Sequence, residues 1–345
     1  MQFIKPNTNI DFIGRRVIAY SVSAALFLMT FIVLLIQGGP RYGIDFSGGT
    51  VIQVKFEKPV DVGEIKSGLG TVDLGHSAVQ RFGDRKDNEF LIRTDLFETN
   101  ATEFTQQIQT ALGTTSGGKA EIRRVEAVGP QVGKDLREKA SFALFYAILF
   151  ITIYISGRFE MKWLQSGVMT VALIGSVYFL SIWGVSIPML IGAALLISIV
   201  LFWVLGLKYA MGAIIALFHD VVITVGVFAI MDKEFNLPII AALLTIVGYS
   251  LNDTIIVYDR IRENLKKHHK NPLDVIINRS VNETLSRTLL TAGTTLITLL
   301  ALLFLGGSII HDFAFAMTIG VVIGTYSSIY VASPILLAFR ESPKR

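Results

Sequence analysis

The chain contains eight apolar stretches, and most of them are long enough to cross the hydrocarbon core of a bilayer as a helix, which takes about 20 residues. They lie at residues 17–36, 141–156, 163–183, 188–207, 209–230, 237–258, 288–306 and 313–338. Hydrophobic residues make up 52% of the 345 residues and charged residues only 17%, which excludes an ordinary soluble globular domain. The sequence therefore predicts a polytopic α-helical membrane protein with about eight transmembrane helices.

The N-terminal region predicts a membrane anchor that is not cleaved. Residues 1–16 are polar and basic, and the apolar stretch behind them lacks a small-residue cleavage site. We therefore expect a cytoplasmic segment over 1–16 and a first transmembrane helix over 17–36. Cysteine is absent from the sequence, which excludes disulfides, a thiolate nucleophile and cysteine metal ligands.

A soluble region, 37–140, separates the first two apolar stretches. Four of its segments resemble strands and two resemble helices, one of them clearly amphipathic. The strands are expected at 51–56, 77–82, 89–94 and 120–128, and the helices at 60–69 and 101–112, with Asn100 as the N-cap of the second. The order β-α-β-β-α-β is that of a small α+β ferredoxin-like domain.

The positions of lysine and arginine predict how the helices are oriented, because cytoplasmic loops of membrane proteins are enriched in basic residues. With a cytoplasmic N-terminus, Lys233 is the only basic residue in a short outside loop. The inside segments carry Lys5, Arg15, Arg16, Arg158, Lys162, Lys208, Arg260, Arg262, Lys266, Lys267, Lys270, Arg279, Arg340, Lys344 and Arg345. We therefore expect both termini inside and the 37–140 domain outside. The remainder is a transmembrane bundle over 141–339, with a basic cytoplasmic loop at 259–287, and a cytoplasmic tail over 340–345.

Ionisable side chains in the apolar stretches mark the candidate site, because a charge inside a membrane helix is costly and rarely idle. Asp253 and Arg287 lie at comparable depth on consecutive spans, so we expect them to form an ion pair. Each belongs to a polar face with helical spacing. The first face carries Thr245, Gly248, Tyr249, Asn252 and Asp253, and the second carries Arg287, Thr291, Thr294, Thr295 and Thr298.

Two interpretations of the Asp253–Arg287 pair follow from these residues. An opposite charge favours the charged carboxylate and burial disfavours it, so a conformational change could move a proton on or off the site. Alternatively, the pair is a static salt bridge between two helices. His219 and Asp220 are also ambiguous, because they could relay protons or serve only in helix packing. The threonines are consistent with simple interhelical hydrogen bonding.

Signatures of enzymes and cofactor sites are weak. His268 and His269 have no third ligand nearby, so no metal site is expected. The segment Ser47-Gly48-Gly49 lacks the following helix and lysine of a phosphate-binding loop. Nucleic-acid binding by the basic loop is not expected beside a membrane. We predict a protein that is not an enzyme, needs no cofactor and is driven by an ion gradient or by a partner.

With these residues in view, the chain resembles the SecF family, the smaller membrane subunits of the bacterial SecD–SecF translocation factors in the resistance-nodulation-division superfamily. The segments that carry the resemblance are YGIDFSGG (42–49), VGPQVG (128–133), RFE (158–160), GAIIALFHD (212–220), GYSLND (248–253), DRIREN (259–264) and RTL (287–289). Together they cover most of the chain outside one insertion.

The resemblance implies half of a resistance-nodulation-division-like membrane fold in the bacterial inner membrane, with six spans and a periplasmic ferredoxin-like domain after the first. It implies as partners a SecD-like subunit, the Sec translocation channel with its accessory membrane proteins, an unfolded polypeptide in translocation, and protons. The family's proton-coupling aspartate and arginine match Asp253 and Arg287. Apart from the resemblance, the polar residues of the spans that are candidates for proton relay or helix packing are His219, Asp220, Asn252, Tyr249 and Thr291. The family motif near the base of the periplasmic domain is Gly43, Asp45, Phe46, Gly48 and Gly49.

The chain departs from the family at about residues 161–208, where two apolar spans replace one short cytoplasmic turn. Because two spans are added, every later loop keeps its side of the membrane, and we expect a peripheral hairpin that faces lipid or a partner. Two other functions stay open: a proton-driven exporter of small molecules or lipids from the same superfamily, and a non-transporting assembly scaffold. Such exporters usually carry both halves in one chain.

Overall fold

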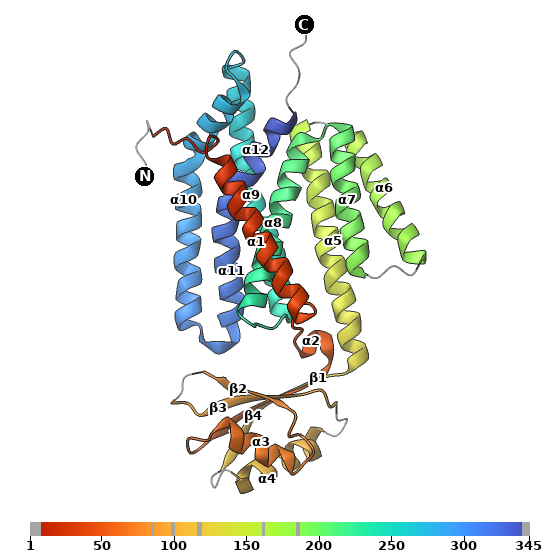
Figure 1. Cartoon of the computed structure of the whole chain (residues 1–345), viewed down its shortest axis with the longest axis vertical. Helices are drawn as coiled ribbons and strands as arrows, with labels where there is room; N and C mark the ends of the chain where they lie inside the picture. The colour runs from red at the N-terminus through yellow and green to blue at the C-terminus, as the bar shows by residue number, and fades with distance from the viewer. Residues whose placement is uncertain are drawn as a thin grey trace.

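In the computed structural model, one small sheet is set apart from a large helical bundle (Figure 1). The structure describes residues 8–83, 86–97, 101–115, 119–160, 163–183 and 187–339. Within these residues, six helical segments are long and apolar enough to cross a membrane. They are α1 (Arg16–Gln37), α5 (Pro130–Glu160), α8 (Lys208–Ile230), α9 (Leu237–Lys267), α10 (Leu273–Leu305) and the run that starts with α11 (Gly307–Ser327). The prediction of a multi-pass helical membrane protein is thus confirmed.

The inserted segment forms two further helices, α6 (Trp163–Ile182) and α7 (Ile187–Leu205), which lie beside α5 at one side of the bundle (Figure 1). They are not among the six, so the predicted count of eight spans is not confirmed. Their exposed outer face fits the expected periphery, but Met169, Leu173 and Phe202 are buried against the bundle. The Trp203 ring also lies 5.1 Å from that of Phe339. Residues 184–186, in the turn of the hairpin, lie outside the described residues.

The sheet domain (residues 49–128) contains four strands and two helices in the order expected from the sequence. Its elements are β1 (Gly49–Phe56), α3 (Val62–Gly70), β2 (Ala78–Phe82), β3 (Glu89–Thr94), α4 (Ala101–Thr115) and β4 (Ala120–Val128). The strands are antiparallel in the order β2-β3-β1-β4. Alternate side chains such as Ile52, Val54 and Ile92 pack on Ile108 of α4, which buries one face of the sheet. Asp61 caps α3 by accepting from Gly63 N at 3.2 Å. The predicted cap Asn100 lies outside the described residues.

Several helices run beyond the spans expected from hydropathy. Helix α5 begins at Pro130, so the last residues of the predicted 37–140 domain belong to a helix that continues into the bundle. Helices α9 and α10 occupy most of the predicted loop at 259–287 and leave only residues 268–272 between them. Hydropathy detects the part of a helix that lies in hydrocarbon, whereas charged residues such as those of DRIREN extend the same helix into water. The helical ends therefore differ from the predicted loop boundaries.

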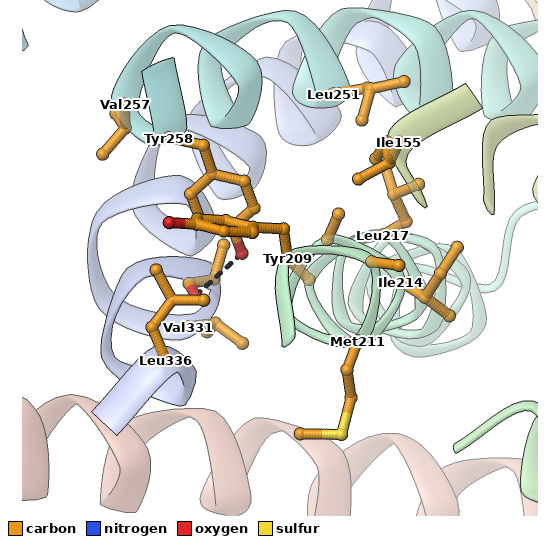
Figure 2. Packing of buried hydrophobic residues seen from close by; sticks show 14 of the residues in the cluster. Ile155, Tyr209, Met211, Ile214, Leu217, Leu251, Val257, Tyr258, Val331 and Leu336 are labelled. Atoms are coloured by element: carbon orange, nitrogen blue, oxygen red, sulfur yellow. Dashed lines mark hydrogen bonds between the residues drawn. The ribbon is translucent and has the colours of Figure 1, made fainter. Parts of the chain in front are cut away.

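The centre of the bundle is formed by α8, α9 and the last helical run, and Figure 2 shows this packing close by. Tyr258 of α9 is fully buried and donates to the Ala332 carbonyl at 3.0 Å. Its ring lies edge-on to that of Tyr209 on α8, with 5.2 Å between centroids. Ala332 ends a one-turn π-helix (Ser328–Ala332), which is followed by α12 (Ser333–Ile335) and a 3₁₀ turn (Leu336–Phe339). A π-helical turn often marks a functional region of a helix.

Helices α9 and α11 approach each other closely because glycines of α11 lie at the contact. A Cβ on Gly320 would lie 2.3 Å from the Ile246 side chain, and one on Gly324 would lie 2.9 Å from the Cβ of Ser250. Small residues four apart allow this approach in membrane helices. The close contact places Ser250 deep in the bundle, one helical turn before Asp253.

Gly324→Ala is expected to destabilise the bundle by about 1–3 kcal/mol, the usual cost of overpacking. The neighbouring Ser250 cannot move aside freely, because its hydroxyl donates to a buried carboxylate. The thermal midpoint of the purified protein measures the effect. Gly175→Ala is the matched control, because a Cβ on Gly175 of α6 would meet nothing within 4 Å. Equal thermal midpoints for the two variants would show that an added methyl group fits at Gly324, and that α9 and α11 are therefore less closely packed than in this structure.

Candidate functional site

Asp253 is a buried carboxylate near the middle of α9. Its side chain belongs to a residue only 1% exposed, and neither carboxylate oxygen has a hydrogen-bond partner within the described residues. Buried polar groups are nearly always paired, so an unpaired carboxylate needs an explanation. Keeping it costs stability, which indicates a role other than holding the helices together.

The expected contact between Asp253 and Arg287 is not made. Arg287 is exposed on α10, whereas Asp253 is buried, and within the described residues neither Asp253 oxygen accepts a hydrogen bond from Arg287. The Arg287 charge is nevertheless near enough to act electrostatically on the Asp253 carboxylate. A static salt bridge between the two side chains is therefore not present, and their comparable depth in the membrane stays a prediction.

The predicted polar faces of α9 and α10 meet at one point and are otherwise largely exposed. Tyr249 of α9 donates to Thr295 of α10 at 3.2 Å. On α9, Asn252 is exposed, and on α10, Thr291 is half-buried and donates to the Arg287 carbonyl at 3.0 Å. We call the exposed part of the two faces the polar stripe; it consists of Thr245, Gly248, Asn252, Arg287, Thr294 and Thr298.

His219 and Asp220 form the centre of a buried hydrogen-bond network in α8. One Asp220 oxygen lies 3.0 Å from His219 Nδ1. The other accepts from Ser250 of α9 at 2.5 Å and from Ser327 of α11 at 2.8 Å. Asp220 is fully buried, and both of its oxygens are satisfied. The two intramembrane aspartates therefore differ in kind, because one is fully paired and the other has no partner.

The network extends from α8 to α1 through the histidine ring. His219 Nε2 lies 2.9 Å from Ser23 Oγ, and Ser23 lies 3.2 Å from the Tyr326 hydroxyl of α11. The His219 ring stacks on Tyr326 and also contacts Phe27, with centroids 5.9 and 5.6 Å apart. Side chains from four helices thus converge on one histidine–aspartate pair, which is the arrangement expected of a packing core.

The motif before the sheet domain forms a tight turn at the base of that domain. It includes a short helix, α2 (Ile44–Ser47), that the sequence did not predict. Gly48 and Gly49 have φ angles of 78° and 115°, which favour glycine. A Cβ on Gly48 would lie 2.8 Å from Pro130 Cα, and one on Gly49 would lie 2.5 Å from the Thr94 carbonyl. Phe46 is 3% exposed and meets the Tyr42 ring edge-on.

Two other residues of this motif contact the start of α9. Gly43 N donates to the Phe235 carbonyl at 2.6 Å, and the Asp45 carboxylate accepts from Leu237 N at 2.9 Å. Because these contacts join residues about 190 positions apart, no periodicity in the sequence could have revealed them. Within the described part of the chain, no group of three or more His, Asp or Glu side chains gathers as metal ligands would.

Together these features define a class of protein: a multi-pass membrane bundle with an unpaired buried carboxylate, joined at one end to a small αβ domain. Comparison with known protein families supports this class. The family described as "Protein export membrane protein SecD/SecF, C-terminal" matches residues 107–180 and 169–342, and the "SecD/SecF GG Motif" family matches residues 33–60.

Curated relatives and solved structures narrow this class. The SecF protein translocase subunit of Magnetococcus marinus is 44% identical over 352 residues, covering 100% of this chain and 96% of the relative. The SecF protein translocase subunit of Calditerrivibrio nitroreducens is 38% identical, and the alignment covers 100% of this chain and 99% of the relative. The crystal structure of SecDF from Thermus thermophilus superposes with a TM-score of 0.76 at 32% identity. The superposition covers 97% of this chain and 39% of the SecDF chain. The chain therefore belongs to the SecF family, whose members are non-enzymatic subunits of the protein translocase.

Proposed function

We propose that the chain works with a SecD-like subunit to assist protein export through the Sec channel, using the proton motive force. The observation that carries this proposal is the buried, unpaired carboxylate of Asp253. A fixed structural charge would have donors around it, whereas a carboxylate that binds and releases protons must keep a changeable environment. The direct test is proton-driven export by an Asp253→Asn variant.

Asp253 is the proton-binding group in this proposal, and Arg287 is the charge that tunes it. The exposed guanidinium on α10 acts on the carboxylate without contacting it. A relative movement of α9 and α10 would therefore change the electrostatic attraction between them, which varies with distance. The unfolded polypeptide and the accessory proteins of the channel are partners of the same proposed machine.

The SecD-like partner completes the bundle in this proposal. This chain spans only 39% of the SecDF chain on which it superposes, so the remainder of that assembly has no counterpart here. The polar stripe supports the idea that α9 and α10 face protein. Polar side chains at membrane depth usually face a bundle interior or a partner rather than lipid. We place the partner on this stripe.

The proposed placement has both termini in the cytoplasm and the sheet domain in the periplasm of a bacterium. The skewed distribution of basic residues supports this orientation. We propose a ferredoxin-like fold for the sheet domain on the basis of its element order and its strand order β2-β3-β1-β4. We also propose that α6 and α7 cross the membrane as an inserted hairpin. The family match divides into two segments that overlap within α6, which supports an insertion there.

Thr294→Trp is expected to reduce recovery of the SecD-like subunit in co-purification by about tenfold or more, because a bulky ring on the polar stripe would block close helix packing. Val171→Trp is the matched control, since Val171 is 72% exposed on α6, away from the stripe. The measurement is the ratio of the two subunits after affinity purification of the tagged chain. Equal ratios for both variants would place the partner elsewhere.

A further inference from the structure

The loop between α8 and α9 is built into the base of the sheet domain. Tyr42 and Phe235 form a parallel β-bridge. Gly43 N donates to the Phe235 carbonyl at 2.6 Å, and Phe235 N donates to the Arg41 carbonyl at 2.7 Å. Phe235 is also 4% exposed and belongs to the apolar core of the bundle. One residue thus pairs with the domain through its backbone and with the bundle through its side chain.

Ion pairs reinforce this backbone contact. Arg93 of β3 pairs with Glu234 of the loop, and its second nitrogen donates to the Tyr42 carbonyl at 2.7 Å. Arg41 pairs with Asp232 on the more exposed side. The Arg93 side chain is only 17% exposed, so its pair is less screened than one at an open surface. The sheet domain is therefore fixed to the loop by both backbone and side-chain contacts.

The same contact extends into α9 itself. Leu237 N, at the start of the helix, donates to the Asp45 carboxylate at 2.9 Å, and Ile239 N donates to the Asn236 side chain at 3.2 Å. The first turn of a helix has unpaired N–H groups and a partial positive charge, so a carboxylate from outside the helix stabilises it. Asp45 thus belongs to the sequence motif of the domain base and caps the helix that carries Asp253.

We propose that these contacts form a rigid joint that carries movement from α9 to the sheet domain. We call it the base joint; it consists of residues 41–45, Arg93 and residues 232–237. Asp253 lies about 24 Å along α9 from Leu237, at 1.5 Å per residue. A tilt or shift of this helix at Asp253 therefore displaces its far end, and the base joint passes that displacement to the domain. Asp45, Arg93 and Glu234 are positioning residues in this mechanism. The inference rests on the proposed function of Asp253.

Charge reversal at the base joint tests this inference. Glu234→Arg places two arginines together, and we expect proton-driven export to fall by about tenfold. The double variant Glu234→Arg/Arg93→Glu restores the pair, so export should return to within about threefold of wild type, the remainder reflecting the lost donor to the Tyr42 carbonyl. Arg124→Glu is the matched control, because its partner Glu126 lies on the same strand of the sheet domain. Full export by Glu234→Arg at normal abundance, or failure of the double variant to recover, overturns the joint.

Proton passage separates failure of the joint from failure of the proposed function. The assay uses membrane vesicles that contain the full chain with its SecD-like partner. Asp253→Asn should lose both proton passage and export. Glu234→Arg should lose export while proton passage stays within about twofold of wild type, because the proton-binding group is untouched. If the Asp253→Asn variant exports normally, the proposed function is wrong. If the Glu234→Arg variant loses proton passage as well as export, the base joint is not the element that transmits the movement.

A reversible crosslink tests rigidity independently. The natural sequence has no cysteine, so Tyr42→Cys/Phe235→Cys introduces one defined pair. Residues paired across a β-bridge have Cα atoms within the range of a disulfide. Because oxidised and reduced samples share the same substitutions, their ratio reports the crosslink alone. We expect equal export, within about twofold. Loss of export on oxidation, with recovery on reduction, would mean that this contact must open and would overturn the proposal.

Discussion

Replacing Asp253 with asparagine is expected to abolish proton-driven export while leaving the abundance and stability of the protein near wild type. Asparagine has the shape of aspartate but cannot take up and release a proton at this position. The carboxylate has no hydrogen-bond partner to lose, so the change in folding free energy should stay within about 1 kcal/mol. Loss of export without loss of stability is the signature of a functional group rather than a structural one.

The measurement is export of a reporter protein from cells that express the variant in place of the wild-type chain, with membrane abundance measured in parallel. Asp259→Asn is the control, because Asp259 is on the same helix but is only half-buried and is paired with Arg158. Normal export by Asp253→Asn at wild-type abundance would favour the assembly scaffold, in which buried charges are only structural. The same result would remove the main support for proton coupling.

The transmembrane parts of this fold could be predicted from sequence because one physical quantity, the apolar length of a segment, defines them. The same holds for Asp253, whose cost in a membrane identifies it without any knowledge of its neighbours. Its depth relative to Arg287 follows from loop length and orientation. Whether the two side chains meet depends on the rotation of each helix about its axis, which apolar composition leaves undetermined. The exposed position of Arg287 is therefore a structural finding.

Contacts between distant residues could not be predicted in this way. The Ser23–His219 contact joins residues 196 positions apart, and Asp45 reaches Leu237 across 192. Hydropathy and periodicity describe local structure, so they cannot identify such pairs. The sequence identifies His219 and Asp220 as polar residues inside an apolar stretch. Whether they relay protons or only pack helices together depends on which side chains they contact, and the sequence does not show those contacts. Those partners include Ser250 and two residues of the last helical run, none of them marked by a sequence pattern.

The two buried aspartates lead to opposite expectations although both lie in the same bundle. Asp220 contacts three side chains, so its carboxyl group is held in one fixed arrangement of α8, α9 and α11. Asp253, one turn beyond Ser250, is without such donors. The Asp220 network therefore holds the face of α9 from which the unpaired Asp253 carboxylate projects. Substitutions at the two positions should separate stability from export.

Asp220→Ala is expected to destabilise the protein strongly, since it leaves His219 Nδ1 and the Ser250 hydroxyl buried without their partner, whereas the Ser327 hydroxyl keeps the Gly324 carbonyl as an acceptor. Each unsatisfied buried group costs about 1–3 kcal/mol. Each kcal/mol lowers the thermal midpoint of a chain of roughly 150–250 residues by about 2–4 °C, and somewhat less in a longer chain. A drop of about 5 °C or more in the purified protein is therefore expected, together with low abundance in the membrane.

Asp253→Ala is the matched control, because it removes a buried carboxylate without orphaning any donor, and its midpoint should equal that of the wild type or lie slightly above it. Asp220→Asn should lie between the two extremes, since its amide oxygen can still accept from the hydroxyls of Ser250 and Ser327. If Asp220→Ala instead kept normal stability and lost export, the histidine–aspartate pair would belong to the proton path. If it lost stability and the asparagine variant exported normally, the pair is a packing core, and Asp253 remains the buried carboxylate that we propose as the proton-binding group.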